Sequence, residues 1–304
     1  MGSPLRLALG ARSSQAAATE HWWRDVVDEF EAAEQAMSRF RETSELTVIN
    51  RTAGSGLAAR PSVRLRRALV AADRARRITG GRFDPRVLAD LDRLGYRGAA
   101  LHDDLAPPAA ERAPAPTGPV VERTDRDHLT LDRPVDLGGI GKGLTLRWAA
   151  ALLSAHGADD FLLEAGGDLV ARGRSPEDGP WRLGIEDPDG GPDPLAVIAV
   201  TDSAVATSST RINRWTVDGR QVHHLLDPKT GEPFVGGLVS VTVAAADPAW
   251  AEVWSKVLFL DGRDGIAAEA RSRGLAAWWV FEDGTLEMTP AARALTIWVA
   301  GEPA

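Results

Sequence analysis

The chain has 304 residues, 44% of them hydrophobic, which is enough for a globular core, so a disordered protein is not expected. Its 35 lysines and arginines stand against 43 aspartates and glutamates, and the resulting net charge of −8 disfavours nucleic acid as a partner. The absence of cysteine excludes disulfides, thiolate metal sites, a cysteine nucleophile and a lipid-modified N-terminal cysteine.

The N-terminal segment gives no sign of a membrane span or a signal peptide. The apolar patch Leu5–Leu9 is short and Arg6 interrupts it, and no run in the chain approaches the roughly 18 residues that a span needs. We therefore expect a cytoplasmic protein without a membrane span.

Two amphipathic helices are predicted in the first third of the chain, followed by a loop. Apolar residues recur every three or four positions over residues 17–40, and a second such pattern covers residues 62–78. Arginines crowd the polar side of the second helix without interleaved aromatic residues, which favours a solvated face over a nucleic-acid site. Residues 99–119 are rich in alanine and proline and predict an exposed loop.

The remainder of the chain mixes strands and helices and shows no internal repeat. The dipeptide Asp247-Pro248 is typical of a helix start, because an N-cap residue is followed by proline in the first turn. We expect strands at residues 128–131, 161–163, 196–200 and 238–245, and helices at about 144–155 and 247–260.

The glycine-rich segment 135–143 is the most informative stretch. It places four glycines around Lys142, between a short extended segment and a predicted helix. Free amides at a helix N-terminus, with a lysine beside them, form an anion site suited to a phosphate or diphosphate. A plain glycine-rich turn explains the same sequence, because short glycine motifs recur widely.

Two turn-like segments carry further candidate residues. Segment 79–85, Thr-Gly-Gly-Arg-Phe-Asp-Pro, is typical of a helix C-terminal stop followed by a turn. His223 and His224 precede the turn Asp-Pro-Lys-Thr-Gly at 227–231. Adjacent residues of a strand face opposite ways, so at most one of these histidines can serve a site as general base, and a packed, hydrogen-bonded histidine is the alternative.

The predicted helix after Asp247 brings three polar residues to one face. Glu252, Ser255 and Lys256 are spaced by three and four residues, so they could converge on one ligand. A simple Glu-to-Lys ion pair across one helical turn explains the same spacing.

In this order, the segments resemble the ApbE family of FAD:protein FMN transferases. Further similarity lies in Met-Ser-Arg-Phe at 37–40, Ser-Glu-Leu at 44–46 with Asn50, the segment 163–168 ending in Ala-Gly-Gly-Asp, and Ser-Val-Thr-Val at 240–243. The similarity is clearest over residues 37–262. It implies one α+β domain over residues 1–304, with mixed sheets and packed helices in two interleaved lobes and FAD bound between them.

The resemblance also implies an activity and a set of site residues. Family members transfer FMN from FAD to a threonine hydroxyl of a target flavoprotein and release AMP. His224 would act as general base, with Asp227 beside it and Lys142 stabilising charge on the diphosphate. The residues that would bind FAD are Phe40, Arg82, Phe83, Asp84, Asp136, Lys142 and Leu226.

The metal site implied by the resemblance is altered. The family holds Mg²⁺ with an aspartate, a threonine four residues later and a backbone carbonyl near Gly139, but here Glu252 replaces the aspartate and Lys256 the threonine. The candidate metal residues are then Gly139, Glu252 and Ser255. A protonated lysine has no acceptor and repels a cation, so we hypothesise that the Lys256 ammonium occupies part of the metal's place.

Three functions follow from these matches and departures. The first is an FMN transferase, which needs a metal or a working substitute. The second is a non-catalytic FAD-binding protein, and the third is an FAD hydrolase that uses water in place of the threonine hydroxyl. A further departure is Arg211, which stands two residues after Ser209, where the family has a tyrosine two residues after a glycine.

Overall fold

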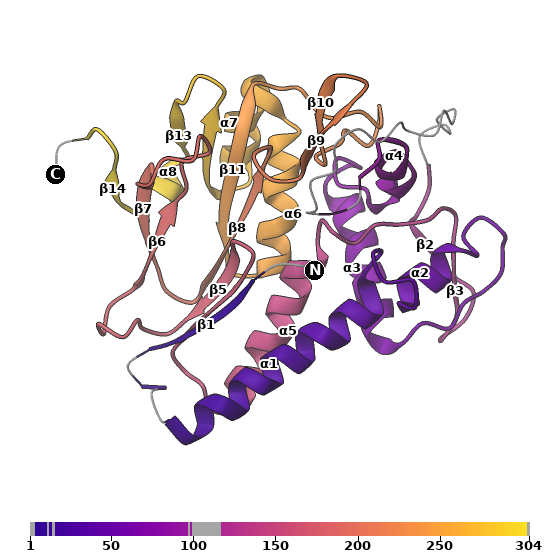
Figure 1. Cartoon of the computed structure of the whole chain (residues 1–304), viewed down its shortest axis with the longest axis horizontal. Coiled ribbons are helices and arrows are strands. Elements are labelled where there is room, and N and C mark those ends of the chain that lie inside the picture. The colour runs from indigo at the N-terminus through magenta and orange to yellow at the C-terminus, as the bar shows by residue number, and fades with distance from the viewer. Residues whose placement is uncertain (1–3, 11, 14–15, 97, 99–116, 303–304) are drawn as a thin grey trace. The chain divides into compact units, whose positions relative to one another are not determined.

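The computed structural model describes residues 4–10, 12–13, 16–96, 98 and 117–302 (Figure 1). The chain divides into two compact units, each assembled from separate stretches of sequence. We call residues 31–141 and 212–234 the helical unit, and residues 2–30, 142–211 and 235–304 the sheet unit. The predicted loop at 99–119 lies outside the described residues except for its last three positions.

The sheet unit is built on a seven-stranded sheet with the order β1-β4-β5-β8-β11-β12-β13. A second sheet has the order β14-β7-β6. The sequence predicted mixed sheets, but every strand pairing among the described residues is antiparallel. The strands of the two sheets are β1 Leu5–Leu9, β4 Phe161–Ala165, β5 Asp168–Arg172, β6 Trp181–Ile185, β7 Ala196–Val200, β8 Ser203–Ser209, β11 Leu238–Ala245, β12 Ala276–Phe281, β13 Leu286–Met288 and β14 Thr296–Val299.

Helix α6, Pro248–Phe259, covers the central strands of this sheet (Figure 1). Ten of its twelve residues are buried, as expected for a helix that is apolar on nearly every side. Strand β11 is buried along most of its length, and α6 packs against it. Ala244 of β11 also belongs to an apolar cluster with Ile198 of β7 and Trp278 of the neighbouring strand β12. The sheet unit also contains α7 Gly262–Ser272, α8 Pro290–Arg293, most of α5 Gly141–Ala155, and the first part of α1 Ala16–Met37.

The helical unit contains short helices and two small hairpins. Ser62 caps α3 by accepting a hydrogen bond from the Leu65 amide, and the helix ends before Gly80 and Gly81, whose positive φ values fit the predicted stop. Its elements are α2 Glu45–Asn50, α3 Val63–Ile78, the 3-10 helix η1 Pro85–Val87, α4 Leu88–Arg93, and the hairpins β2 Val121–Arg123 with β3 Leu129–Leu131 and β9 Arg214–Val217 with β10 Arg220–His223.

Two local predictions need correction. The Asp84-Pro85 pair starts a helix, because the Asp84 side chain accepts a hydrogen bond from the Arg86 amide and Pro85 occupies the first position of η1. Helix α5 begins at Gly141, three residues before its predicted start, within the glycine-rich segment. The other predicted helices and strands agree with the structure to within a few residues, and none of the described helices is long and apolar enough to cross a membrane.

Candidate functional site

Two lysines and two carboxylates form a charged network inside the sheet unit. Lys142, in the first turn of α5, forms an ion pair with Asp168 at the start of β5. On α6, the Lys256 ammonium lies 3.7 Å from Glu252 Oε1. The other oxygen of Glu252 accepts a hydrogen bond of 2.8 Å from the Gly143 amide. Each acid of the network therefore has one lysine as its partner.

The Glu252 carboxylate lies at the centre of this network and is almost completely inaccessible, with 1% of its side chain exposed. Burial raises the pKa of Glu252, because the charged form loses its hydration. The charges of Lys256 and Lys142 and the Gly143 amide act in the opposite direction, and the charge of Asp168 adds to the increase. The two lysines and the Gly143 amide thus favour an ionised carboxylate at this position.

Hydroxyl groups complete the surroundings of the network. Ser255 donates a hydrogen bond of 2.9 Å to the Glu252 carbonyl, and its oxygen lies 2.8 Å from that of Ser208 on β8. The Thr207 amide donates to Asp168 Oδ1 over 3.1 Å, and the hydroxyl of Thr207 pairs with that of Thr242 at 2.9 Å. The Ser255 oxygen therefore already has two partners within the protein.

These residues do not fit a magnesium ion held in the family's manner. Mg²⁺ requires oxygen ligands in octahedral geometry, and position 256 offers an ammonium without an acceptor. Both Glu252 oxygens already face a protein donor or cation. Of the predicted metal residues, Glu252 and Ser255 come together on α6, while Gly139 belongs to the helical unit.

The glycine-rich segment is only partly as predicted. A helix does start within it, but the Gly143 amide, expected to be free for an anion, is occupied by Glu252. Gly143 also explains why glycine is needed here, since an added Cβ would lie 2.5 Å from backbone atoms of α6. The Gly138 amide is likewise occupied, because it donates to the Asp136 carboxylate. The segment therefore forms a close contact between α5 and α6 and is also a candidate binding loop.

An aromatic cluster in the helical unit gathers residues from three distant segments of the chain. Tyr96 packs edge-on against Phe40 at 6.0 Å between ring centroids. It also stacks on Trp215 at 5.2 Å and on His224 at 6.1 Å. Phe40 remains 53% exposed, so the cluster presents an open aromatic ring. Two predicted site residues, Phe40 and His224, are thus joined through one tyrosine.

Arg39 is the charged member of this cluster. Its guanidinium lies 4.8 Å from the Phe40 ring centroid and 5.2 Å from that of Tyr96, within range of a cation–π contact. It donates a hydrogen bond of 2.7 Å to the Tyr96 carbonyl and one of 3.3 Å to Asp136. Asp136 is therefore fixed next to the aromatic cluster through Arg39.

The two histidines differ in surroundings, and only His223 lies in a strand, because β10 ends there. The Leu225 amide lies 3.3 Å from His223 Nδ1 and donates to it. Burial lowers the pKa of His223, and a contact with the Phe234 backbone offsets part of this effect. His224 instead stacks on Tyr96, while Leu226 is buried against leucines of the α4 region.

Asp227 and the residues from 82 to 84 have structural partners. Asp227 Oδ1 accepts the Lys229 amide at 2.8 Å, which closes the predicted turn. Phe83 is buried, and Arg82 donates to the Thr79 carbonyl. The Asp84 carboxylate binds the Arg86 guanidinium through two hydrogen bonds of 2.9 and 2.7 Å, and Arg76 donates a third of 3.1 Å.

Several residues of these clusters were not predicted as site residues, among them Asp168, Arg39, Tyr96 and Trp215. Asp168 ends the Ala-Gly-Gly-Asp segment and Arg39 lies in Met-Ser-Arg-Phe, so both belong to stretches already singled out for resemblance. Tyr96 is the only tyrosine of the sequence and lies in no such motif. The structure brings the predicted residues together in two groups, one per unit: Phe40, Asp136 and His224 in the helical unit, and Lys142, Glu252 and Ser255 in the sheet unit.

Comparison with known structures defines the class of fold. The ApbE protein of Thermotoga maritima superposes with a TM-score of 0.81 at 25% identity, covering 96% of this chain and 99% of that one. The apo flavinyl transferase ApbE of Pseudomonas stutzeri gives 0.78 at 24% identity, with 96% of each chain covered. The predicted α+β class is confirmed.

The protein belongs to the ApbE family, whose sequence profile matches residues 1–279. A relative from Klebsiella pneumoniae (strain 342), named FAD:protein FMN transferase, is 32% identical over 169 residues. That alignment covers 54% of this chain and 48% of the relative. The chain spans about half the length of the first curated relatives it matches.

Proposed function

We propose that this protein binds FAD and transfers its FMN half to a threonine hydroxyl of an acceptor flavoprotein, with release of AMP. Membership in the ApbE family supports the proposal, as does the relative named FAD:protein FMN transferase. The acidic net charge of −8 fits a protein acceptor and a small-molecule donor better than a nucleic-acid partner.

The observation that carries the proposal is the aromatic cluster around Tyr96. A flavin ring is a large flat π-system, and the half-exposed Phe40 ring offers it a stacking surface. Arg39 holds the neighbouring Tyr96 carbonyl and Asp136 in place, which orients polar groups beside that surface. In this proposal Arg82, Phe83, Asp84 and Leu226 also contact FAD. Leu226 is held by packing and Asp84 by its ion pair with Arg86.

The proposed transfer is a displacement at phosphorus. The threonine oxygen attacks the phosphorus of the FMN half, and the bond from that phosphorus to the bridging oxygen of the diphosphate breaks. AMP leaves with the bridging oxygen, and His224 accepts the hydroxyl proton. Asp227 supports His224 by closing the turn that follows it.

Lys142 is proposed to stabilise the diphosphate while it keeps its ion pair with Asp168. An ammonium has three N–H donors, so it can serve a carboxylate and phosphate oxygens together. The altered α6 leads us to propose no role for Mg²⁺ in this step. The Lys256 ammonium, which lies beside Glu252, is the positive charge that the protein itself supplies there.

The test uses purified protein, FAD and an acceptor domain that contains the target threonine. The expected result is covalent flavin fluorescence on the acceptor and one AMP per flavin transferred, both absent when the acceptor threonine is replaced by valine. Bound flavin without AMP would identify a binding protein, and AMP release without covalent flavin would identify a hydrolase. Either result would overturn the transferase proposal.

A further inference from the structure

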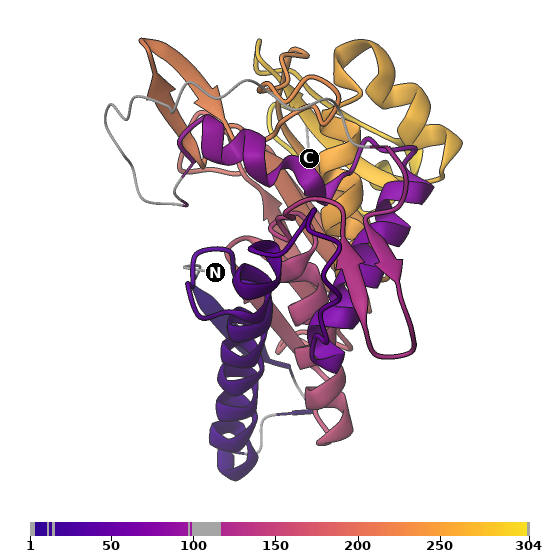
Figure 2. The same ribbon diagram turned by 90° about the vertical axis from the view of Figure 1, so that its right-hand side faces the viewer.

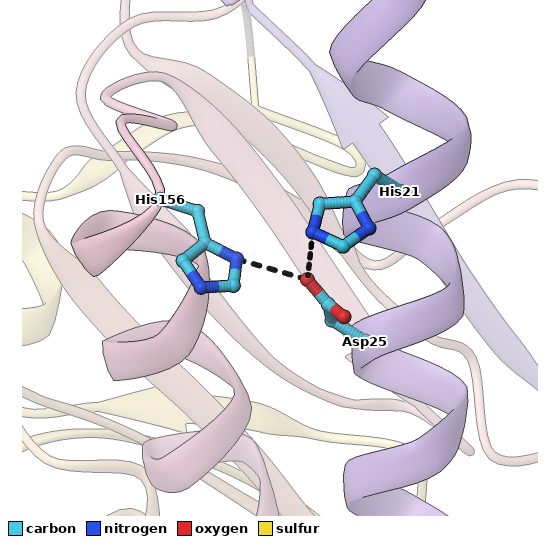
Figure 3. A group of neighbouring side chains, drawn as sticks. All are labelled: His21, Asp25 and His156. Carbon is cyan, nitrogen blue, oxygen red and sulfur yellow. Dashed lines mark ion pairs between the residues drawn. The ribbon is translucent and has the colours of Figure 1, made fainter.

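Two histidines and one aspartate of the sheet unit point toward one another near the end of α5 opposite to Lys142 (Figure 3). His21 and Asp25 lie one turn apart on α1, and His156 directly follows the C-terminal end of α5. These parts of α1 and α5 lie side by side in both views of the chain (Figures 1 and 2).

The donor atoms of the three side chains are close enough to share one ion. His156 Nδ1 lies 2.9 Å and His21 Nε2 3.4 Å from Asp25 Oδ2, and all three donor atoms lie within 4.8 Å of one another. Zinc–ligand bonds of about 2.0–2.2 Å in a tetrahedral site place neighbouring ligand atoms roughly 3.4 Å apart. The distance from His21 to the carboxylate oxygen matches that separation, and the distance from His156 is shorter.

Asp25 Oδ2 is a second sign of a ligand. The atom is buried, and it accepts no hydrogen bond of normal geometry from the described residues, although both imidazole nitrogens lie near it. A buried carboxylate oxygen without such a bond is costly unless a cation compensates it. A metal ion bound by all three donors would provide that compensation.

The backbone positions of the three residues are fixed, while the rings can adjust. His21 and Asp25 are within a regular helix, and the His156 amide donates to the carbonyls of Leu152 and Leu153 at 3.1 Å each. The two imidazole rings are nearly parallel, at 13° with centroids 5.6 Å apart, so they must rotate for one ion to lie in both ring planes. The χ2 torsion of histidine is broad, which permits this rotation.

We propose that His21, Asp25 and His156 form a binding site for a divalent transition-metal ion, with zinc as the reference ion. Two imidazoles with one carboxylate suit Zn²⁺, Ni²⁺ or Cu²⁺, whereas Mg²⁺ prefers an all-oxygen set. The C-terminal end of α5 adds favourable electrostatics for a cation. A bound ion joins α1 to the end of α5 and leaves one coordination position for water.

Zinc titration of tag-free protein by calorimetry, without FAD or acceptor, tests the site. We expect one zinc ion per chain and an increase in the thermal unfolding temperature, because an ion that binds only the folded state stabilises it. His156→Ala and His21→Ala are each expected to weaken zinc binding by more than about tenfold. Mg²⁺ at the same concentration should produce neither effect.

His128→Ala is the matched control, because the exposed His128 ring has one carboxylate partner, Asp125, at 2.9 Å. This variant should bind zinc as the unchanged protein does. Absence of zinc binding at millimolar zinc, or equal affinity in the unchanged protein and both site variants, would overturn the proposal. Neither readout depends on transferase activity, so the result is independent of the proposed function.

Discussion

The Lys256 ammonium lies 3.7 Å from the Glu252 carboxylate, one helical turn away on α6, at the two positions where the ApbE resemblance implies magnesium ligands. The second oxygen of Glu252 accepts the Gly143 amide. The protein therefore compensates its buried acid with its own cation and its own backbone. This arrangement distinguishes the chain from the family pattern at the level of charge, without a change in fold.

The double variant Lys256→Thr, Glu252→Asp is expected to gain magnesium affinity. It removes the ammonium, adds a hydroxyl acceptor and restores the shorter acid of the family pattern. Magnesium titration by calorimetry should show binding that the unchanged chain lacks, and AMP release from FAD should become magnesium-dependent.

Lys256→Met serves as the control for this variant, because it removes the charge without adding a metal ligand. It should gain no magnesium affinity and should lose about 1–3 kcal/mol of unfolding free energy, since Glu252 loses a partner in a buried site. If the double variant binds no more magnesium than this control, Lys256 is not what prevents magnesium binding.

The raised pKa of Glu252 predicts a pH dependence of stability. In the folded state the acid binds a proton at higher pH than it does when unfolded, because burial disfavours its charge. The folded state then binds more protons, so the contribution of Glu252 to stability rises as the pH falls through the folded pKa, and it levels off below the unfolded value. Urea unfolding of the unchanged chain and Glu252→Gln between neutral and mildly acidic pH measures this.

The difference in unfolding free energy, unchanged chain minus Glu252→Gln, should increase toward acidic pH. Glutamine stays neutral at every pH and still offers an oxygen to the Gly143 amide, so other titrating groups cancel in the comparison. A difference that stays constant or decreases as the pH falls would contradict a raised pKa at this position.

Local signals predicted the elements well where a residue has one dominant physical role. Asp247 accepts hydrogen bonds from the amides of Ala249 and Trp250, as an N-cap before proline should, and β11 spans the predicted residues 238–245. The start of α5 was missed, because glycine is a poor helix former and its presence suggested a loop. Packing against α6, which requires glycine at 143, overrides that weak propensity.

Site partners were harder to predict than site residues. The i,i+4 spacing predicted the Glu252–Lys256 pair, because both residues share one helix face. The contact of Glu252 with the Gly143 amide joins residues 109 positions apart, and no local pattern encodes it. The stack around Tyr96 likewise joins three segments that are far apart in the sequence, and no local pattern encodes it. Such contacts depend on how distant elements pack against one another, and a single sequence does not reveal that packing.

Replacement of Arg86 by methionine should strongly destabilise the helical unit. Its side chain is fully buried, with 0% exposed, and it binds Asp84 and Asp132. Burial alone lowers the pKa of Arg86, but the hydrogen bonds and charges of both aspartates together raise it above its ordinary value. Removal of the guanidinium deprives buried Asp84 of two hydrogen bonds and leaves it Arg76 as a cationic partner, so we expect a cost of about 3 kcal/mol, the lower end for a broken buried ion pair.

Chemical denaturation of Arg86→Met, with Arg77→Met as the matched control, checks this prediction. Arg77 forms a surface ion pair with Asp73 across one turn of α3, and such pairs contribute under about 1 kcal/mol. Arg86→Lys should recover part of the loss, since it keeps the charge but not the two parallel hydrogen bonds. Equal stability of the two methionine variants would show that the buried cluster contributes little.

The paired histidines allow the proposed general base to be tested against its neighbour. His224 stacks on Tyr96 in the aromatic cluster, whereas His223 accepts a hydrogen bond from the Leu225 amide and burial lowers its pKa. His224→Asn should decrease kcat for flavin transfer by about 10²–10⁴-fold, the usual contribution of general-base catalysis. The affinity for FAD should change little, because the Phe40 surface remains.

His223→Asn is the matched variant, since it removes an imidazole one residue away. It should reduce stability through lost packing but leave kcat close to that of the unchanged chain. Both proteins are assayed at a temperature below their unfolding transitions, so that each is fully folded. The two rings have different neighbours, so we expect only one of them to approach the threonine hydroxyl. A loss of kcat in His223→Asn with normal turnover in His224→Asn would identify His223 as the general base. The base would then not belong to the Tyr96 cluster.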